Sequence, residues 1–113
     1  MPAGIEDRIR AKLLDYAKAK QIVLVPYGTL AAELGEHVMA VSNRTTLNRI
    51  ADREKSNNRP DITFILKNRR TGYPGQIGGK RAHPPSPEQK QRAKAEMQEI
   101  IREYSPCSSN PYP

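Results

Sequence analysis

The chain of 113 residues has one cysteine, Cys107, no tryptophan and a single phenylalanine. One cysteine excludes an internal disulfide and a zinc site built from cysteines. The longest apolar run, residues 22–25, is far shorter than the roughly 20 apolar residues that a transmembrane helix needs. No basic-then-apolar leader opens the sequence. We therefore expect a cytoplasmic protein that has no membrane partner.

Apolar and aromatic residues are also scarce, at 36% and 5% of the chain, which supports only a small core. The length fits one domain and leaves no room for two. We expect this domain to span residues 1–104, with its core in 5–79 and an additional helix over 87–104. Three prolines fall within residues 105–113, and this tail is expected to be disordered.

Acidic residues are rare in the middle of the sequence. Residues 44–83 contain ten Lys or Arg and three acidic residues, whereas the two kinds are equal in number on either side. This stretch therefore accounts for the whole formal charge of +7. Clustered cations gain affinity for nucleic acid by displacing counterions. The plainer alternative is a solvated basic surface.

The spacing of apolar residues, together with capping and turn residues, predicts the secondary structure. The expected elements are a helix over 5–20, a short strand or connector over 22–25, a helix over 29–34 ended by Gly35, a helix over 43–55 capped by Ser42 or Asn43, a strand over 62–66, a turn over 67–75, a short return strand over 76–78, and a helix over 87–104 that starts with a Ser86–Gln89 capping box.

Three helices followed by a two-stranded turn predict an α+β fold, a winged helix-turn-helix with an additional C-terminal helix packed on its core. In that layout the helix over 43–55 is the recognition helix, and the turn over 67–73 is a basic wing. An α-helix fits a groove of B-form DNA, and Arg, Asn and Thr side chains can reach base edges from it.

The candidate nucleic-acid-binding residues divide by role. Those expected to enter a groove are Asn43, Arg44, Thr45, Asn48 and Arg49, and those expected to hold phosphates are Arg53, Lys67, Arg69 and Arg70. Tyr73 in the wing either stacks on a base or packs on the sheet as a turn residue. Asp52 lies on the same helix face and is repelled by phosphates, so an ordinary amphipathic surface helix is the alternative.

The segment Tyr27-Gly28-Thr29-Leu30-Ala31-Ala32-Glu33-Leu34-Gly35 resembles the Tyr-Gly-x-Leu-Ala-x-x-x-Gly helix-turn signature in the DNA-binding domain of alkylguanine-DNA alkyltransferases. The similarity extends over about residues 5–79. Arg44 is similar in position to the helix-borne arginine finger of that family, residues 60–65 resemble its proline-led apolar strand, and residues 71–75 resemble its glycine turn. The resemblance implies a winged-helix DNA-binding domain whose helix-turn signature consists of Tyr27, Gly28, Leu30, Ala31 and Gly35.

The reactive cysteine of that family has no counterpart here. Where the family has Pro-Cys-His-Arg, this chain has Phe64-Ile65-Leu66-Lys67, and Cys107 lies in the proline-rich tail. Alkyl transfer needs an activated thiolate. The resemblance therefore implies alkyltransferase-like DNA binding without the transfer reaction. We expect no enzymatic activity, no cofactor and no metal.

These observations favour a non-enzymatic protein whose partner is duplex DNA. An RNA-binding or ribosome-associated protein is one alternative, because the basic stretch also suits an irregular polyanion. A protein-interaction or inhibitor module is another; it would use the helix over 87–104, with Met97, Ile100 and Ile101 as an exposed apolar patch. A homodimer formed through that helix is also compatible, since many such modules bind paired half-sites.

Overall fold

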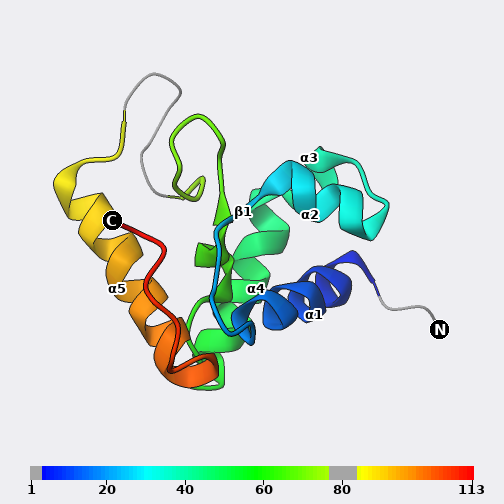
Figure 1. The fold of residues 1–113 in the computed structure, drawn as a ribbon. Helices are drawn as coiled ribbons and strands as arrows, with labels where there is room; N and C mark the ends of the chain where they lie inside the picture. The colour runs from blue at the N-terminus through cyan, green and yellow to red at the C-terminus, as the bar shows by residue number, and fades with distance from the viewer. Residues whose placement is uncertain (1–3, 77–83) are drawn as a thin grey trace.

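The computed structural model describes residues 4–76 and 84–113. The elements follow the order α1 (Ile5–Ala17), β1 (Val25–Pro26), α2 (Tyr27–Leu34), α3 (Val38–Val41), α4 (Arg44–Ser56), the 3-10 helix η1 (Ile62–Ile65), β2 (Leu66–Lys67) and α5 (Pro87–Tyr104). Helices α1, α2 and α4 lie on one side of the central segment formed by β1, η1 and β2, and α5 lies on the other (Figure 1). Helices combined with one small sheet confirm the α+β class.

The centre of the fold is a 3-10 helix over residues 62–65, where the sequence predicts a strand over 62–66; the prediction is wrong for these four residues, and Leu66 lies in strand β2. All four residues of η1 are buried, and the element packs against α1, α4 and α5. Such burial on every side removes the alternation of inward and outward residues that a surface strand needs. The turn itself is set by Asp61, whose Oδ1 accepts hydrogen bonds from Thr63 N at 2.9 Å and from Thr63 Oγ1 at 2.5 Å.

The sheet is also not the predicted wing. Strand β2 pairs in parallel with β1, with Val25 opposite Leu66 and Pro26 opposite Lys67. The partner of β2 therefore comes from before α2, not from a return strand after the turn. Gln76, the first residue of that predicted strand, lies in a turn, and residues 77 and 78 lie outside the described part of the chain.

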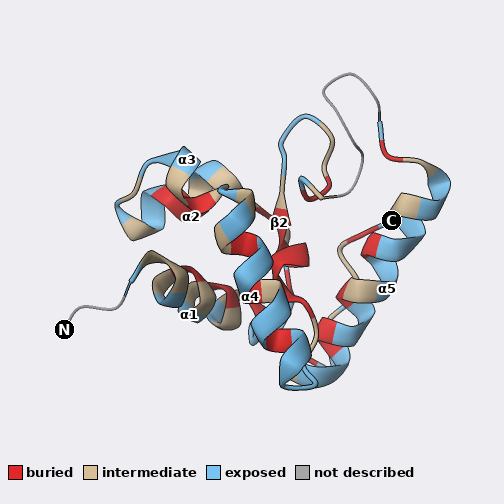
Figure 2. Ribbon diagram, turned by 180° about the vertical axis from the view of Figure 1, so that it is seen from behind, coloured by how far each residue is buried: buried red, intermediate tan, exposed pale blue. Residues whose placement is uncertain are grey.

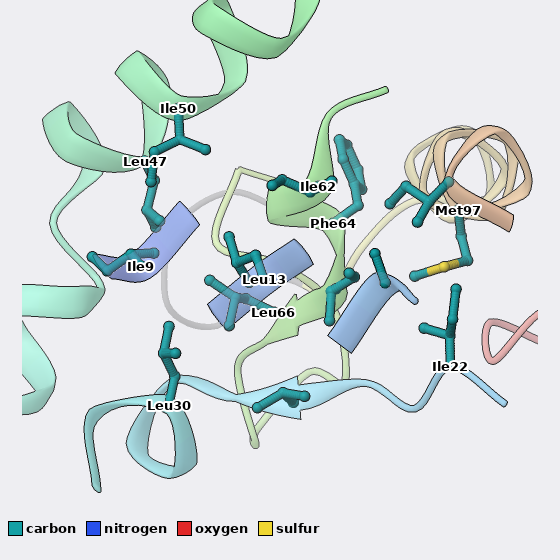
Figure 3. Close-up of a cluster of buried hydrophobic side chains, with 14 of the residues drawn as sticks. Ile9, Leu13, Ile22, Leu30, Leu47, Ile50, Ile62, Phe64, Leu66 and Met97 are labelled. Carbon is teal, nitrogen blue, oxygen red and sulfur yellow. The ribbon is translucent and has the colours of Figure 1, made fainter. Parts of the chain in front are cut away.

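The core is formed by one apolar cluster that gathers around η1 and β2 (Figure 3). It receives side chains from every large helix, and each of the following is at most 1% exposed: Ile9 and Leu13 from α1, Leu30 from α2, Leu47 and Ile50 from α4, and Met97 from α5. Figure 2 shows that the buried residues of α4 and α5 face this centre, while their exposed residues face outward. The core thereby fixes which face of α4 meets solvent.

The helix ends agree with the sequence in most cases, because their signals are local. Gly35 ends α2 with a positive φ of 66°, the left-handed conformation that glycine adopts most easily. Ser86 and Gln89 form the capping box that starts α5. Helix α1 ends at Ala17 and is therefore shorter than the predicted helix over 5–20, whose last three residues lie beyond it.

Residues 105–113, predicted to be disordered, pack against the domain. The ring of Tyr112 is buried, with 2% exposed, and its hydroxyl donates a hydrogen bond to the Phe64 carbonyl at 2.5 Å. Ile22 N donates to Ser108 Oγ at 3.0 Å, which ties the segment to the chain before β1. The high proline content therefore marks an irregular strap, and not a mobile tail.

Helix α5 does not present the apolar patch that an interaction module would use. Its inward residues Ala93, Met97, Ile100 and Ile101 are each no more than 2% exposed. The helix packs with this face on η1 and α1. The patch predicted for the protein-interaction alternative is therefore part of the core.

Candidate nucleic-acid interface

Helix α4 presents a polar half to solvent. Asn43 caps the helix by accepting a hydrogen bond from Thr46 N at 3.1 Å, as predicted for one of its two candidate caps. Leu47 and Ile50 are buried on the inner side. The outer side carries exposed residues that the sequence singled out, namely Asn43, Thr45, Asn48, Arg49 and Arg53, together with the acidic Asp52. The backbone therefore offers these residues to a ligand in one continuous row.

Arg44, the first residue of α4, is held between its own helix and the chain after β2. Its Nε donates to Asn48 Oδ1 at 3.1 Å, and its Nη1 donates to Gln76 Oε1 at 3.0 Å. The side chain is half-buried in this position, whereas the neighbouring Thr45 is exposed. Two hydrogen bonds fix the direction of the guanidinium and place it between α4 and the following loop.

The predicted wing is a closed loop, which we call the basic loop (residues 67–76). Asn68 makes three hydrogen bonds within it, each at 2.8 Å. Its N–H donates to Tyr73 O, its carbonyl accepts from Gly72 N, and its Oδ1 accepts from Arg70 N. Gly72 turns the chain with a φ of 76°. The loop presents Arg69 and Arg70 as exposed side chains, and Lys67 is half-buried at its base.

The N-terminus of α2 meets the basic loop. Gly75 N donates to the Tyr27 hydroxyl at 2.9 Å, across 48 positions of sequence. A cavity of about 380 Å³ lies at this junction and is lined by Tyr27, Val38, Ser42, Arg44, Asn68 and Gly75. Three segments far apart in the sequence therefore meet at one place: the start of α2, the start of α4 and the basic loop.

Tyr73 does not present its ring to a ligand, which corrects its assignment as a nucleic-acid-binding residue. The side chain is 7% exposed, and its ring stacks on that of Tyr112, with 5.3 Å between centroids and 22° between planes. A base cannot stack on a ring whose faces are covered. Of the two roles that the sequence allowed, the structure favours packing, although the ring packs on Tyr112 and not on a sheet.

Ion pairs divide the cations of the domain into two groups. The arginines and lysine of α1 have acidic partners: Arg8 pairs with Glu36, Arg10 with Glu54 and Lys12 with Glu33. Among the residues that the structure describes, no carboxylate forms an ion pair with the five cations of the outer start of α4 and the basic loop, which are Arg44, Arg49, Lys67, Arg69 and Arg70. Their charge is therefore available to an external anion.

Arg53 belongs to the first group, which lowers its value as a phosphate contact. Its Nη1 donates to Asp7 Oδ1 at 2.9 Å, and this exposed pair links α4 to α1. The partner lies 46 positions away, at the start of the first helix. An external phosphate would have to compete with this carboxylate for the guanidinium.

The five signature residues serve helix α2 and its surroundings. The helix begins at Tyr27, two residues earlier than predicted, and Leu30 and Ala31 are its buried residues. Gly35 ends it, and Gly28 has open space where a side chain would project. The sequence missed the roles of Asn68 and Gln76. An Asn four residues before a glycine is a turn signal that could have indicated Asn68, whereas nothing local indicates the bond of Gln76 to Arg44.

Comparison with known proteins adds no assignment, because no family model, curated protein or solved structure matches this chain. Within residues 4–76 and 84–113, no three His, Cys, Asp or Glu side chains gather as a metal site. The described helices include none that is long and apolar enough to cross a bilayer.

Proposed function

We propose that this chain is a non-enzymatic DNA-binding protein that holds duplex DNA between the exposed face of α4 and the basic loop. The proposal assigns base-edge contacts to Thr45, Asn48 and Arg49. It assigns phosphate contacts to Lys67, Arg69 and Arg70. Phosphate contacts fix the register of a protein on the duplex, whereas contacts to base edges carry sequence preference.

The observation that carries the proposal is the bond between Arg44 and Gln76. It joins the first turn of α4 to the end of the basic loop, and so brings Arg44 beside the loop that carries Lys67, Arg69 and Arg70. None of these four cations has a carboxylate partner among the described residues. Cations that contact a polyanion displace counterions from it, and the released counterions favour binding.

The order of elements supports a winged-helix type of binding. In their order along the chain, helix α2, the single turn α3 and helix α4 correspond to the bracing helix, the turn and the recognition helix of a helix-turn-helix. In this proposal the basic loop, closed by the hydrogen bonds of Asn68, serves as the wing. The resemblance to the alkyltransferase DNA-binding domain agrees with this role. The exposed Cys107 lies on the 105–113 segment, to which the proposal assigns no contact with DNA.

The test is a fluorescence anisotropy titration with a labelled duplex of mixed sequence, repeated at two or more salt concentrations. The double variant Arg69→Ala/Arg70→Ala should bind more weakly to every duplex, and its salt slope should fall by about 2, since each phosphate contact contributes about 1. The matched control is Lys18→Ala/Lys20→Ala. It removes the same charge from two exposed residues of the segment that follows α1. That segment lies at the other end of β1 from α2 and away from the basic loop (Figure 1).

We expect the control to keep most of the affinity and salt slope of the wild type. Equal losses in both double variants would contradict the proposed surface, because the effect would then follow net charge alone. Competition with structured RNA decides between the two nucleic acids. If RNA displaces the labelled duplex at a lower concentration than unlabelled duplex does, RNA and not duplex DNA is the preferred ligand. Failure of the wild type to bind either nucleic acid would refute the function.

A further inference from the structure

We propose that Tyr112 is a positioning residue of this interface, one that holds the basic loop beside α4 without touching the ligand. The inference rests on the proposed function for its consequence, which is that nucleic-acid affinity depends on Tyr112 through Arg69 and Arg70. Its structural basis is a contact between two segments that the sequence leaves unrelated.

The contact consists of a ring stack and a hydrogen bond. The ring of Tyr112 stacks on Tyr73 with 5.3 Å between centroids, and the two side chains are 2% and 7% exposed. The Tyr112 hydroxyl donates to the carbonyl of Phe64, which lies in η1 at the centre of the core. Tyr112 therefore connects the basic loop to the most buried element of the fold. Aromatic pairs of this kind stabilise beyond the area that they bury.

The hydroxyl of Tyr112 remains a donor over a wide range of pH. Burial raises the pKa of the phenol above its ordinary value, since the interior disfavours the phenolate. The hydrogen bond to the Phe64 carbonyl requires the protonated phenol. The anchor is thus intact at every pH at which the domain would bind nucleic acid.

The segment that carries Tyr112 is itself fixed at several points. Gln21 Nε2 donates to the Ser109 carbonyl, and Ser109 N donates to Gln21 Oε1, each at 2.9 Å. Gln21 directly precedes the buried Ile22. Asn110 Nδ2 donates to the Lys94 carbonyl on α5 at 2.9 Å, and its Oδ1 accepts from Tyr112 N at 3.0 Å. The 105–113 segment is therefore bonded both to Gln21, in the chain before β1, and to α5. These bonds fix the segment that places Tyr112 against the loop.

The stack acts on Arg69 and Arg70 through the backbone of the loop. Tyr73 O accepts a hydrogen bond from Asn68 N, and Asn68 in turn holds Gly72 and Arg70. A displacement of Tyr73 therefore displaces the turn that carries both arginines. The other anchors hold the two ends of the loop: Lys67 pairs with Pro26 in the sheet, and Tyr27 and Arg44 hold Gly75 and Gln76. Without Tyr112 the middle of the loop loses the contact that joins Tyr73 to the core.

The test is a double-mutant cycle that joins Tyr112 to the two arginines. Tyr112→Ala should weaken duplex binding about fivefold and lower the salt slope, because the arginines no longer reach their phosphates together. The triple variant Tyr112→Ala/Arg69→Ala/Arg70→Ala should bind no more weakly than Arg69→Ala/Arg70→Ala, since Tyr112 acts only through these residues. Tyr112→Phe keeps the stack and loses only the hydrogen bond to Phe64, so its affinity should lie between that of Tyr112→Ala and that of the wild type.

General loss of stability is separated by a control and by a second measurement. Ile100→Val weakens the core at the buried face of α5. The C-terminal half of α5 lies away from the basic loop (Figure 1), so this variant should leave affinity and salt slope unchanged. Amide hydrogen exchange at Asn68 and Gly72, whose N–H groups close the loop, should accelerate in Tyr112→Ala and not in Ile100→Val.

Additive losses in the cycle, or a Tyr112→Ala variant that binds as the wild type does, would overturn the inference. If the wild type binds no nucleic acid, the proposed function fails, and hydrogen exchange still decides the positioning role. Faster exchange at Asn68 and Gly72 supports that role, and unchanged exchange overturns it.

Discussion

Arg10 on α1 donates two hydrogen bonds to the carboxylate of Glu54 on α4, from Nε at 2.9 Å and from Nη2 at 3.2 Å. The Glu54 side chain is wholly buried, whereas the Arg10 side chain is 18% exposed. The hydrogen bond that Arg10 donates to Glu54 raises the pKa of the Arg10 guanidinium above its ordinary value. This fork holds α4 against α1 and so contributes to the orientation of the exposed face of α4.

Removing Arg10 should cost far more than removing an exposed arginine. Arg10→Ala leaves the Glu54 carboxylate buried without its partner, and we expect a loss of about 3–5 kcal/mol in the free energy of unfolding. Arg102→Ala, which breaks an exposed pair with Glu99, should cost about 0–1 kcal/mol. Urea unfolding followed by circular dichroism measures both. Similar costs for the two variants would show that the buried pair does not clamp the helices.

Two glycines of α2 should respond in opposite directions to the same substitution. Gly35→Ala forces a β-carbon into the left-handed conformation and should destabilise the domain by about 1 kcal/mol. Gly28→Ala lies inside the helix with open space around it, so it should stabilise by about 0.5–1 kcal/mol. Thermal unfolding of the two variants provides the comparison. A stabilising Gly35→Ala would contradict the left-handed end of α2.

Stability should fall in alkaline solution because of Tyr112. Its pKa is raised by burial in the folded state, so above the ordinary pKa of about 10 the unfolded chain releases a proton that the folded chain keeps. The contribution of Tyr112 is fully present below pH 10 and declines by about 1.4 kcal/mol per pH unit above it. Tyr112→Phe should make this decline shallower. Urea unfolding at intervals between about pH 8 and pH 11 tests it, and parallel declines in both proteins would refute the assignment.

Arg49 and Arg53 are both exposed on α4; among the residues that the structure describes, Arg53 has an acidic partner and Arg49 has none. Arg49→Ala should therefore weaken duplex binding about fivefold, the order expected for one lost contact, and Arg53→Ala should weaken it less. Asp7→Asn frees Arg53 from its ion pair and should strengthen binding slightly. Anisotropy titrations at one salt concentration rank the four proteins. A larger loss in Arg53→Ala than in Arg49→Ala would place the ligand nearer α1.

The features predicted correctly from the sequence are those that depend on near neighbours. Asn43 caps α4 through a residue three positions later, and Ser86 and Gln89 cap α5 within four residues. The outer face of α4 follows from the spacing of Leu47 and Ile50 alone. Such signals are short in range and need no knowledge of the rest of the fold.

The features that the sequence missed depend on distant partners. Residues 62–65 resemble a strand in composition, but packing on three sides and the cap from Asp61 make them a 3-10 helix. Tyr112 lies among prolines, yet it fills the space beside Tyr73, 39 positions earlier. The position of Arg44 on its helix predicts a contact with the ligand, but not the hydrogen bond to Gln76 that sets the direction of its guanidinium. No local pattern contains these partners.

The bonds of residues 105–113 to residues 19–22 span 85 to 88 positions, so they cannot form during synthesis until residues 105–113 have left the ribosome. Contacts of such long range also carry the largest closure entropy, which delays them during refolding. On the proposed role of Tyr112, the nascent chain forms its helices before its basic loop is fixed. On the proposed function, capture of nucleic acid by a chain still without residues 105–113 is therefore disfavoured.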